Sequence, residues 1–250
     1  MSEIWRACAG HAPVVALGGT VQRLVESQEQ VATNALVRTL AEQALLEDLL
    51  EASKPPLDTG APRLHYLLAT PFRYAPLPWG SRFGSRFEPG LFYAARSLDT
   101  VLAESAFYRC VFWSGMASPP PAPLHTLHTL FAADISTTRG LQLHAPPFDA
   151  YEPVLTDPQH YAATQALGSA MREAGIVAFE YVSARDPGRG HNVALFTPLA
   201  FARPAPTSLD EWLCETHADR VAYYSRHGGG IREFARETFL VDGALPVPPA

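Results

Sequence analysis

Apolar and polar positions alternate along this chain in a way that predicts interleaved helices and strands. After Ser27, leucines are spaced for one helical face with acidic residues between them, and Ser27 with Gln30 has the form of a capping box. Lys54-Pro55-Pro56 ends this predicted helix, because proline lacks an amide donor. Farther along, the apolar run at 91–95 predicts a short buried strand, and Ser97 is a suitable N-cap for the helix that follows.

The second half of the chain continues the same alternation. Residues 124–135 are predicted to be extended, and a further helix is predicted from Asp157-Pro158 to Gly175. Two strands, 177–182 and 192–196, are predicted on either side of the loop SARDPGRGH. Because the strands are short and the connections long, the pattern favours the α+β class over a regularly wound α/β sheet.

Composition sets the size and the charge of the molecule. Its 250 residues suit one large domain or a domain with an N-terminal extension, and 47% apolar against 18% charged residues allow a sizeable core. The formal net charge is -6, and no cluster of Lys and Arg offers a face for a nucleic-acid backbone. One or two well-placed arginines could still hold a diphosphate.

Cysteine usage and hydropathy indicate where the chain resides. Cys8, Cys110 and Cys214 are far apart and form no CxxC pair, which indicates neither a disulfide framework nor a zinc ribbon. The N-terminus lacks a basic segment followed by an unbroken apolar stretch, and no later run is long enough to span a bilayer. We therefore expect a cytoplasmic protein with no membrane contact.

Several familiar chemical motifs are missing from the sequence. It has no GxxxxGK[ST] phosphate loop, no GxGxxG after a strand, no GxSxG elbow and no HExxH helix. His125 and His128 lie three residues apart in a segment predicted to be extended, so their side chains should point to opposite faces. We therefore expect no metal site.

Candidate site residues occur in three segments: GSRFGSRFEPG, the strand and helix after it, and YVSARDPGRGHN. They are Arg82, Arg86, Tyr93, Glu104, Ser183 and Asn192. Arginines beside glycines can present fixed guanidinium forks to a phosphate, and a glutamate among apolar helix residues is at least partly buried. Taken singly, each feature is more often structural: a surface arginine, a solvated glutamate or a serine that caps a turn.

Taken together, the order GSRF…FYAARSLDTVLAE…YVSARDPGRGHNVALF resembles the RES domain, a family named for its arginine, glutamate and serine. A weaker resemblance extends to VESQEQVATNALVRTLAEQALLEDLLEASKPP and to ETFLVDGALPVP. The resemblance implies an ADP-ribosyltransferase-like fold, with a split, mostly antiparallel sheet and surrounding helices around an NAD⁺ cleft. It also suggests an N-terminal helical extension at 1–60, packed on a RES domain at 61–250.

The function implied by this resemblance is that of a toxin that degrades NAD⁺. Members cleave the nicotinamide–ribose bond by hydrolysis or by phosphorolysis, so NAD⁺ is the expected substrate, inorganic phosphate is a candidate co-substrate, and no metal is required. The expected partner is an Xre-like antitoxin, which would carry the DNA binding that this chain itself lacks. The helix after Ser27 could support a homodimer, although core packing is the simpler interpretation.

The family motif residues fall on identifiable positions of this sequence. The glutamate corresponds to Glu104, the tyrosine to Tyr93 and the serine to Ser183. The arginine pattern G-[GS]-R-[WF] occurs twice: Arg82 fits the usual distance to the tyrosine better, whereas Arg86 is followed closely by Pro-Gly. We favour Arg82 and retain both.

Each residue type suits a step of NAD⁺ cleavage. Positive charge develops on the ribose as the bond breaks, so the Glu104 carboxylate would stabilise the transition state more than the ground state. An arginine fork would hold a phosphate group of NAD⁺, and Tyr93 would pack against the nicotinamide or ribose ring. Ser183 would hydrogen bond the substrate or orient Glu104, and Asn192 is grouped with the substrate-binding residues.

Two other functions fit the same residues. A protein ADP-ribosyltransferase would use the same cleft and differ only in its acceptor. A non-catalytic binding module would keep the fold and bind NAD⁺ without consuming it.

Overall fold

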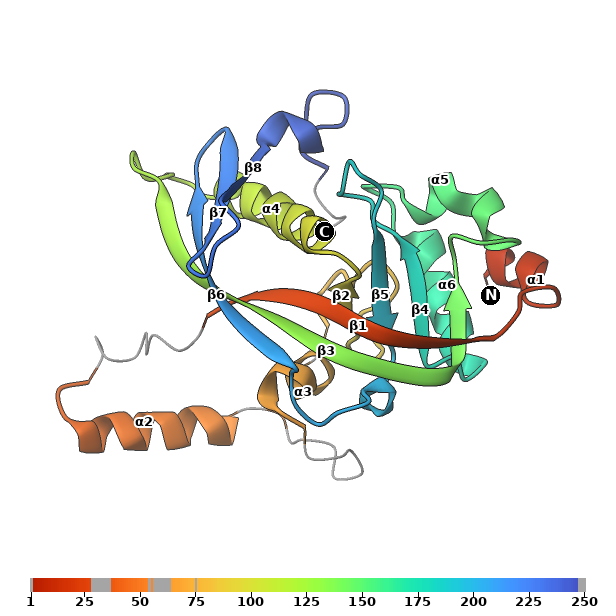
Figure 1. The fold of residues 1–250 in the computed structure, drawn as a ribbon, viewed down its shortest axis with the longest axis horizontal. Helices are drawn as coiled ribbons and strands as arrows, with labels where there is room; N and C mark the ends of the chain where they lie inside the picture. Colours follow the sequence, from red (N-terminus) through yellow and green to blue (C-terminus); the bar gives the residue numbers. More distant parts are fainter. Residues whose placement is uncertain (1, 28–36, 54, 56–63, 75, 247–250) are drawn as a thin grey trace.

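A mixed sheet forms the centre of the computed structural model, which describes residues 2–27, 37–53, 55, 64–74 and 76–246. The sheet has eight strands in the order β1-β2-β5-β4-β3-β6-β7-β8, with an additional β1–β3 pairing (Figure 1). All pairs are antiparallel except β3–β4. The strands are β1 (Val15–Glu26), β2 (Phe92–Ala95), β3 (Leu124–Gln142), β4 (Ala178–Val182), β5 (His191–Leu195), β6 (Ser208–Thr216), β7 (Arg220–Ser225) and β8 (Ile231–Ala235). The predicted α+β class with a mostly antiparallel sheet is confirmed.

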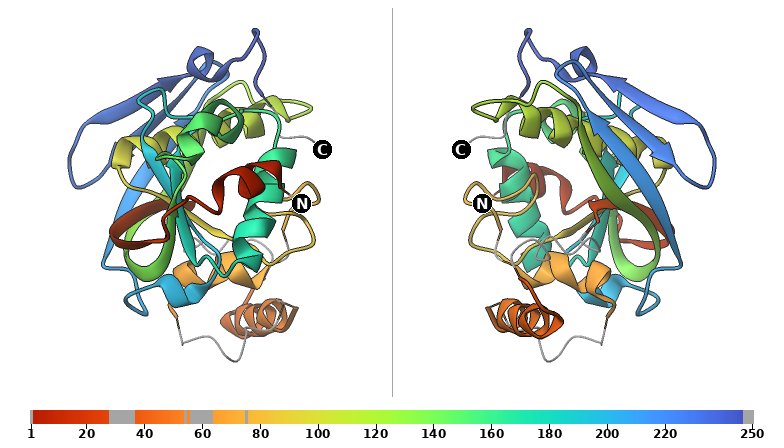
Figure 2. Two further views of the ribbon diagram at one scale, coloured as in Figure 1. Left: turned by 90° about the vertical axis from the view of Figure 1, so that its right-hand side faces the viewer. Right: turned by 90° about the vertical axis from the view of Figure 1, so that its left-hand side faces the viewer.

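Helices cover the sheet in two groups. One group, α1, α5 and α6, lies beside β4, while α4 crosses near β1, β2 and β7 (Figures 1 and 2). The α-helices are α1 (Glu3–Cys8), α2 (Leu40–Ser53), α3 (Tyr66–Arg73), α4 (Leu98–Ser114), α5 (Glu152–Leu155) and α6 (Ala162–Glu173). Short 3₁₀ turns are η2 (Phe148–Tyr151), η3 (Pro198–Ala200) and η4 (Arg236–Phe239). Separate apolar clusters therefore form under each helix group, and a third lies between the strands and α3.

The long strand β3 connects the two halves of the sheet. Along most of its length it pairs with β1, while its first half also pairs with β6 and its last three residues run parallel to β4. β1 in turn reaches β2 through the pair Gln22 and Ala95. As a result β1, β2, β5, β4 and β3 follow one another around a closed circuit, and the cavity described below opens beside β1, β2 and β5.

Most of the predicted element ends agree with the structure. The Ser97 hydroxyl accepts a hydrogen bond from the Thr100 amide at the start of α4, and Gly175 adopts φ +73° just after α6. The predicted start of α6 is wrong. The Asp157 carboxylate accepts the amides of Gln159 and His160, which stabilises a turn, and the helix begins only at Ala162.

The helix predicted to start at Ser27 is also corrected. The Ser27 amide donates to the Leu127 carbonyl, so Ser27 extends the β1–β3 pairing instead of capping a helix. Positions 28–36 of that predicted helix lie outside the described residues, and α2 begins at Leu40. Leu45 and Leu49 are each 59% exposed and α2 stands apart from the rest of the molecule in every view, so core packing does not explain its leucines (Figures 1 and 2).

The N-terminal region is not purely helical as predicted. Between α1 and α2 lies β1, a strand of the central sheet, and α1 packs against α6. Residues 15–26 therefore form part of the folded core, while the proposed domain boundary near residue 60 stays a prediction. Within the described ranges, no helix is long and apolar enough to cross a membrane.

We expect Gly168→Ala to destabilise the protein, because α6 lies against the backbone of the 81–84 segment at this residue. A Cβ on Gly168 would lie 1.8 Å from the Phe83 carbonyl oxygen. Overpacking of this kind costs about 1–3 kcal/mol, which exceeds the gain of about 1 kcal/mol that alanine brings to a helix interior. Urea unfolding measures the change. Gly10→Ala, whose Cβ would meet nothing within 4 Å, is the control, and an unchanged midpoint for Gly168→Ala would contradict the close approach.

Candidate active site

A cavity of about 500 Å³ opens beside β1, β2, β5 and α4. Its wall includes four of the six predicted site residues: Arg82, Tyr93, Glu104 and Asn192. Ser183 lies directly behind the wall and contacts Glu104. The fold therefore brings together residues that are more than a hundred positions apart in the sequence.

Glu104 is held in one orientation by two donors. It projects from α4, and its Oε1 atom accepts a hydrogen bond from the Ser183 hydroxyl at 2.6 Å and another from the Asn192 side-chain amide at 2.6 Å. Hydrogen bonds to a carboxylate of this length are charge-assisted and strong. Within the described part of the chain Oε2 accepts no hydrogen bond, so this oxygen remains available to a ligand.

Ser183 is fixed by the turn that follows β4. Its backbone amide donates to the Gly190 carbonyl, and its hydroxyl oxygen accepts the amides of Arg185 and Asp186 at 3.1 and 3.0 Å. Because a hydroxyl has one proton and two lone pairs, these contacts leave its proton to Glu104 alone. Ser183 is 2% exposed, so it orients Glu104 from behind.

Asn192 reaches the same carboxylate from the neighbouring strand. It lies opposite Tyr181 in the β4–β5 register, and it is buried. The Tyr181 side chain lines the cavity as well, and its pKa is raised well above the usual value by burial and by the nearby Glu104 charge. The paired strands thus place an amide donor and a neutral phenol next to the carboxylate.

Tyr93 connects β2 to the first predicted motif segment. Its hydroxyl lies 2.8 Å from the Ser81 hydroxyl and accepts the Phe83 amide at 3.1 Å, while burial raises its pKa. These bonds fix the backbone on either side of Arg82. Whether its ring also packs against a substrate stays a prediction.

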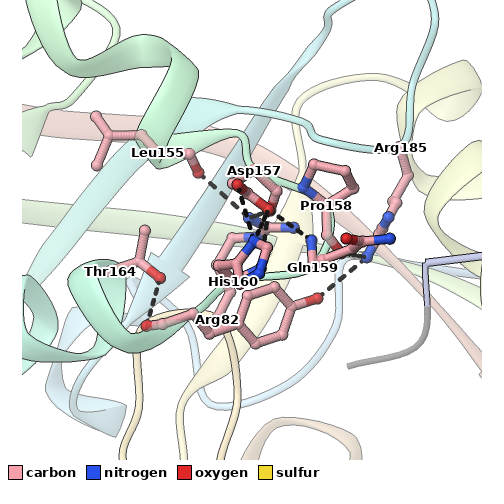
Figure 3. A network of polar contacts seen from close by, with 9 residues as sticks. Arg82, Leu155, Asp157, Pro158, Gln159, His160, Thr164 and Arg185 are labelled. Carbon is pink, nitrogen blue, oxygen red and sulfur yellow. Dashed lines mark hydrogen bonds and ion pairs between the residues drawn. The ribbon is translucent and has the colours of Figure 1, made fainter. Parts of the chain in front are cut away.

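The structure distinguishes the two candidate arginines. The Arg82 guanidinium donates to the carbonyls of Leu155 and Asp157 (Figure 3). It also lines the cavity and packs over the Tyr161 ring at 4.6 Å. Arg86 lies instead over the ring of Phe87 and does not reach the cavity wall. Of the two, only Arg82 is placed to meet a ligand in this cavity.

A second arginine, Arg185, shares the segment that binds Arg82. Its Nη2 atom donates to the Pro158 carbonyl at 2.7 Å and to the Tyr161 hydroxyl at 3.1 Å (Figure 3). Its guanidinium stacks on the Phe107 ring at 3.6 Å. The 155–161 segment is therefore held against the cavity by two guanidinium groups, and both groups face the cavity.

Sequence reasoning missed Arg23, which lies on β1 and also lines the cavity. It donates to the Tyr93 carbonyl at 2.8 Å and packs over the Phe92 ring at 5.1 Å. Burial lowers its pKa to about 10, and no carboxylate pairs with it among the residues that the structure describes. One signal could have revealed it: Arg23 interrupts the apolar alternation of Val21 and Val25, which places a cation on the inward face of a strand.

The cavity carries an excess of positive charge. Arg23, Arg82 and Arg185 line it together with a single carboxylate, Glu104, although the whole chain has a net charge of -6. Cations in a concave, partly apolar wall favour an anionic ligand.

The histidine pair behaves as its spacing predicted. His125 is exposed on β3 and His128 is buried, so the two side chains point to opposite faces. Across the described ranges, no group of three or more His, Cys, Asp or Glu side chains is close enough to hold a metal ion.

Comparison with known proteins gives one family and one fold. Residues 58–217 match the family model of the RES domain. No curated protein matches the chain closely enough to count as a relative. Among solved structures, a chain from the crystal structure of the M. tuberculosis MbcT–MbcA toxin–antitoxin complex has a similar fold, with a TM-score of 0.50 and 11% identity over 82% of this chain and 90% of that one. Because the family model spans more than half of its length, the chain belongs to the RES domain family.

Proposed function

We propose that this protein is a RES-family toxin that cleaves the nicotinamide–ribose bond of NAD⁺. The observation that carries the proposal is the Glu104 carboxylate, which Ser183 and Asn192 hold at the wall of an arginine-rich cavity. Membership of the RES family agrees with this activity, and the fold resembles a chain from a toxin–antitoxin complex.

The proposed chemistry needs one fixed negative charge beside the sugar. As the C1′–N bond breaks, its electron pair leaves with nicotinamide and positive charge develops on the ribose. A preorganised carboxylate at the ribose stabilises that charge without rearranging, which is the most effective form of electrostatic catalysis. In phosphorolysis an anionic phosphate oxygen then bonds to C1′, and in hydrolysis a water oxygen bonds to C1′ and releases a proton to solvent.

The three arginines supply the complementary part of the site. The diphosphate of NAD⁺ carries two negative charges, and guanidinium groups bind phosphate oxygens with paired donors. Arg23, Arg82 and Arg185 each donate some of their N–H groups to backbone or phenol oxygens, which fixes their positions. Their other N–H groups remain for the ligand. Such a site binds the dinucleotide without a metal ion.

We also propose that the toxin acts in the cytoplasm and is neutralised by an Xre-like antitoxin. The toxin–antitoxin description of the structurally similar complex supports a partner protein. A net charge of -6 supports the view that DNA binding resides in that partner. A homodimer remains a second proposal for the exposed helix α2.

Loss of NAD⁺ in the presence of the purified protein tests the proposal. We expect rapid loss with release of nicotinamide, and a comparison of buffers with and without inorganic phosphate separates phosphorolysis from hydrolysis. Labelled NAD⁺ provides the control for the alternative acceptor, because transfer of label to a protein band identifies an ADP-ribosyltransferase. Binding of NAD⁺ with no cleavage under any of these conditions would refute the enzyme and leave a binding module.

A further inference from the structure

Trp79 is a partly exposed aromatic residue of the cavity wall. It is 39% exposed, lines the cavity and precedes the motif segment that begins at Gly80. Among the described residues no other aromatic ring packs against its indole. Large aromatic side chains are normally well buried, so an indole that is 39% exposed at a cavity wall is suited to a flat ligand.

Hydrogen bonds on both sides hold the backbone around Trp79, although the Trp79 side chain is partly exposed. The Gly80 amide donates to the Leu77 carbonyl, and the Ser81 amide donates to the Gly84 carbonyl, each at 2.8 Å. From α6, the Gln165 side-chain amide donates to the carbonyls of Trp79 and Ser81. The indole therefore sits on a preorganised turn, and binding a ligand there costs little ordering of the backbone.

The wall of the cavity carries both charged and apolar side chains. Glu104, Arg82 and Arg185 supply charges, whereas Trp79 and Leu77 are exposed apolar residues on a different chain segment from Glu104 and Arg185. NAD⁺ has the same division, because its charged diphosphate joins two flat bases. One base must lie near Glu104 during cleavage, which leaves the other, the adenine, to be bound elsewhere in the cavity.

Tyr108 is the other exposed aromatic side chain on this wall, but its place on α4 assigns it to the nicotinamide end. It follows Glu104 by four residues, which is one helical turn on the same face. It also packs edge-on against Phe107 at 5.1 Å. Trp79 lies on a separate segment of the chain, so no helical spacing places it beside the Glu104 carboxylate.

We propose that Trp79 is the adenine subsite of this cavity and that it determines the preference for a dinucleotide over a mononucleotide. This inference rests on the proposed function and specifies its substrate class. Stacking on an aromatic side chain recognises a purine by its flat face and adds affinity without taking part in bond cleavage.

The test compares Trp79→Ala with wild type on ligands that have or lack the adenine. We expect KM for NAD⁺ and the dissociation constant of ADP-ribose, measured by calorimetry, to rise about 5- to 150-fold, which is the range of base stacking on an aromatic ring. The turnover number should stay within about twofold, because stacking is the same in the ground and transition states. Nicotinamide mononucleotide lacks the adenine, so its turnover, or its inhibition of NAD⁺ cleavage, should also stay within about twofold.

Two further variants separate stacking from a structural effect. Trp79→Phe keeps an aromatic face and should recover most of the lost affinity for ADP-ribose. Phe87→Ala removes an aromatic residue of the same segment that is 82% exposed and lies outside the cavity. It should leave both KM for NAD⁺ and the dissociation constant of ADP-ribose unchanged.

Two results would overturn the adenine subsite. If Trp79→Ala loses activity equally on NAD⁺ and on nicotinamide mononucleotide, Trp79 acts by holding the shape of the turn around Gly80 and not by binding adenine. Unchanged ADP-ribose binding in Trp79→Ala would place the base elsewhere. A wild-type protein that neither binds nor cleaves NAD⁺ would refute the proposed function itself, which is a different outcome.

Discussion

The Glu104→Gln protein should fold normally and lose most of its NAD⁺ cleavage. The substitution keeps the shape of the side chain and an oxygen that can still accept from Ser183 and Asn192, but it removes the negative charge that we propose to lie beside the ribose. Loss of one preorganised electrostatic group costs about 10²–10³-fold in turnover. The measurement is the initial rate of NAD⁺ loss, with near-ultraviolet circular dichroism to compare the folds.

The ligand affinity of this variant distinguishes catalysis from binding. ADP-ribose should bind to Glu104→Gln about as tightly as to the wild-type protein, because the arginines that we propose to bind the diphosphate are unchanged. Glu88→Gln is the control, since Glu88 lies on the motif segment but not on the cavity wall. If a folded Glu104→Gln protein turns over NAD⁺ at the wild-type rate, Glu104 is not the catalytic carboxylate.

The Ser183→Ala protein should lose both turnover and stability, because Ser183 performs two tasks at once. It donates to Glu104, and it accepts the amides of Arg185 and Asp186. Without the hydroxyl, Glu104 keeps only Asn192 as a partner and samples more orientations, which we expect to reduce turnover by about 10- to 100-fold, below the cost of removing the charge itself. The two amides lose a buried acceptor, which costs about 1–3 kcal/mol of unfolding free energy.

A second buried serine provides a close control for the loss of stability. Ser225 is also 2% exposed; its hydroxyl donates to Asp210 and accepts the His227 amide, but it lies away from the cavity. Ser225→Ala should therefore destabilise the protein without changing turnover per folded molecule. If Ser183→Ala behaves in the same way, Ser183 stabilises the turn and plays no part in positioning Glu104.

Much of the fold was determined by local pattern. The apolar run of β2, the Ser97 cap of α4 and the glycine after α6 are signals within a few residues of one another, and each appears where the pattern predicts it. The candidate residues Glu104, Ser183 and Asn192 were also identified from the sequence, through the resemblance to the RES domain. Only the fold shows that all three meet at one oxygen atom of the carboxylate.

Other features were decided by tertiary structure. Ser27 resembles a helix cap in the sequence, yet its amide bonds to Leu127 directly after β1, because pairing with β3 satisfies its backbone group. Asp157 and Pro158 resemble a helix start, but the segment is held as a turn by the guanidinium groups of Arg82 and Arg185. Contacts of this kind join residues far apart in the sequence, and a local pattern contains no information about them.

Arg23 illustrates the same division most clearly. The sequence by itself showed that an arginine occupies a position where the alternation of Val21 and Val25 calls for an apolar residue. It also gave the types of the other site residues. The pairing of β1 with β2 and β3 decided that this arginine lines the cavity, whereas Arg86, which shares a motif with Arg82, is not part of the cavity wall. Short-range propensity thus fixed which elements form, and the burial of three apolar clusters fixed which charged side chains those elements bring together.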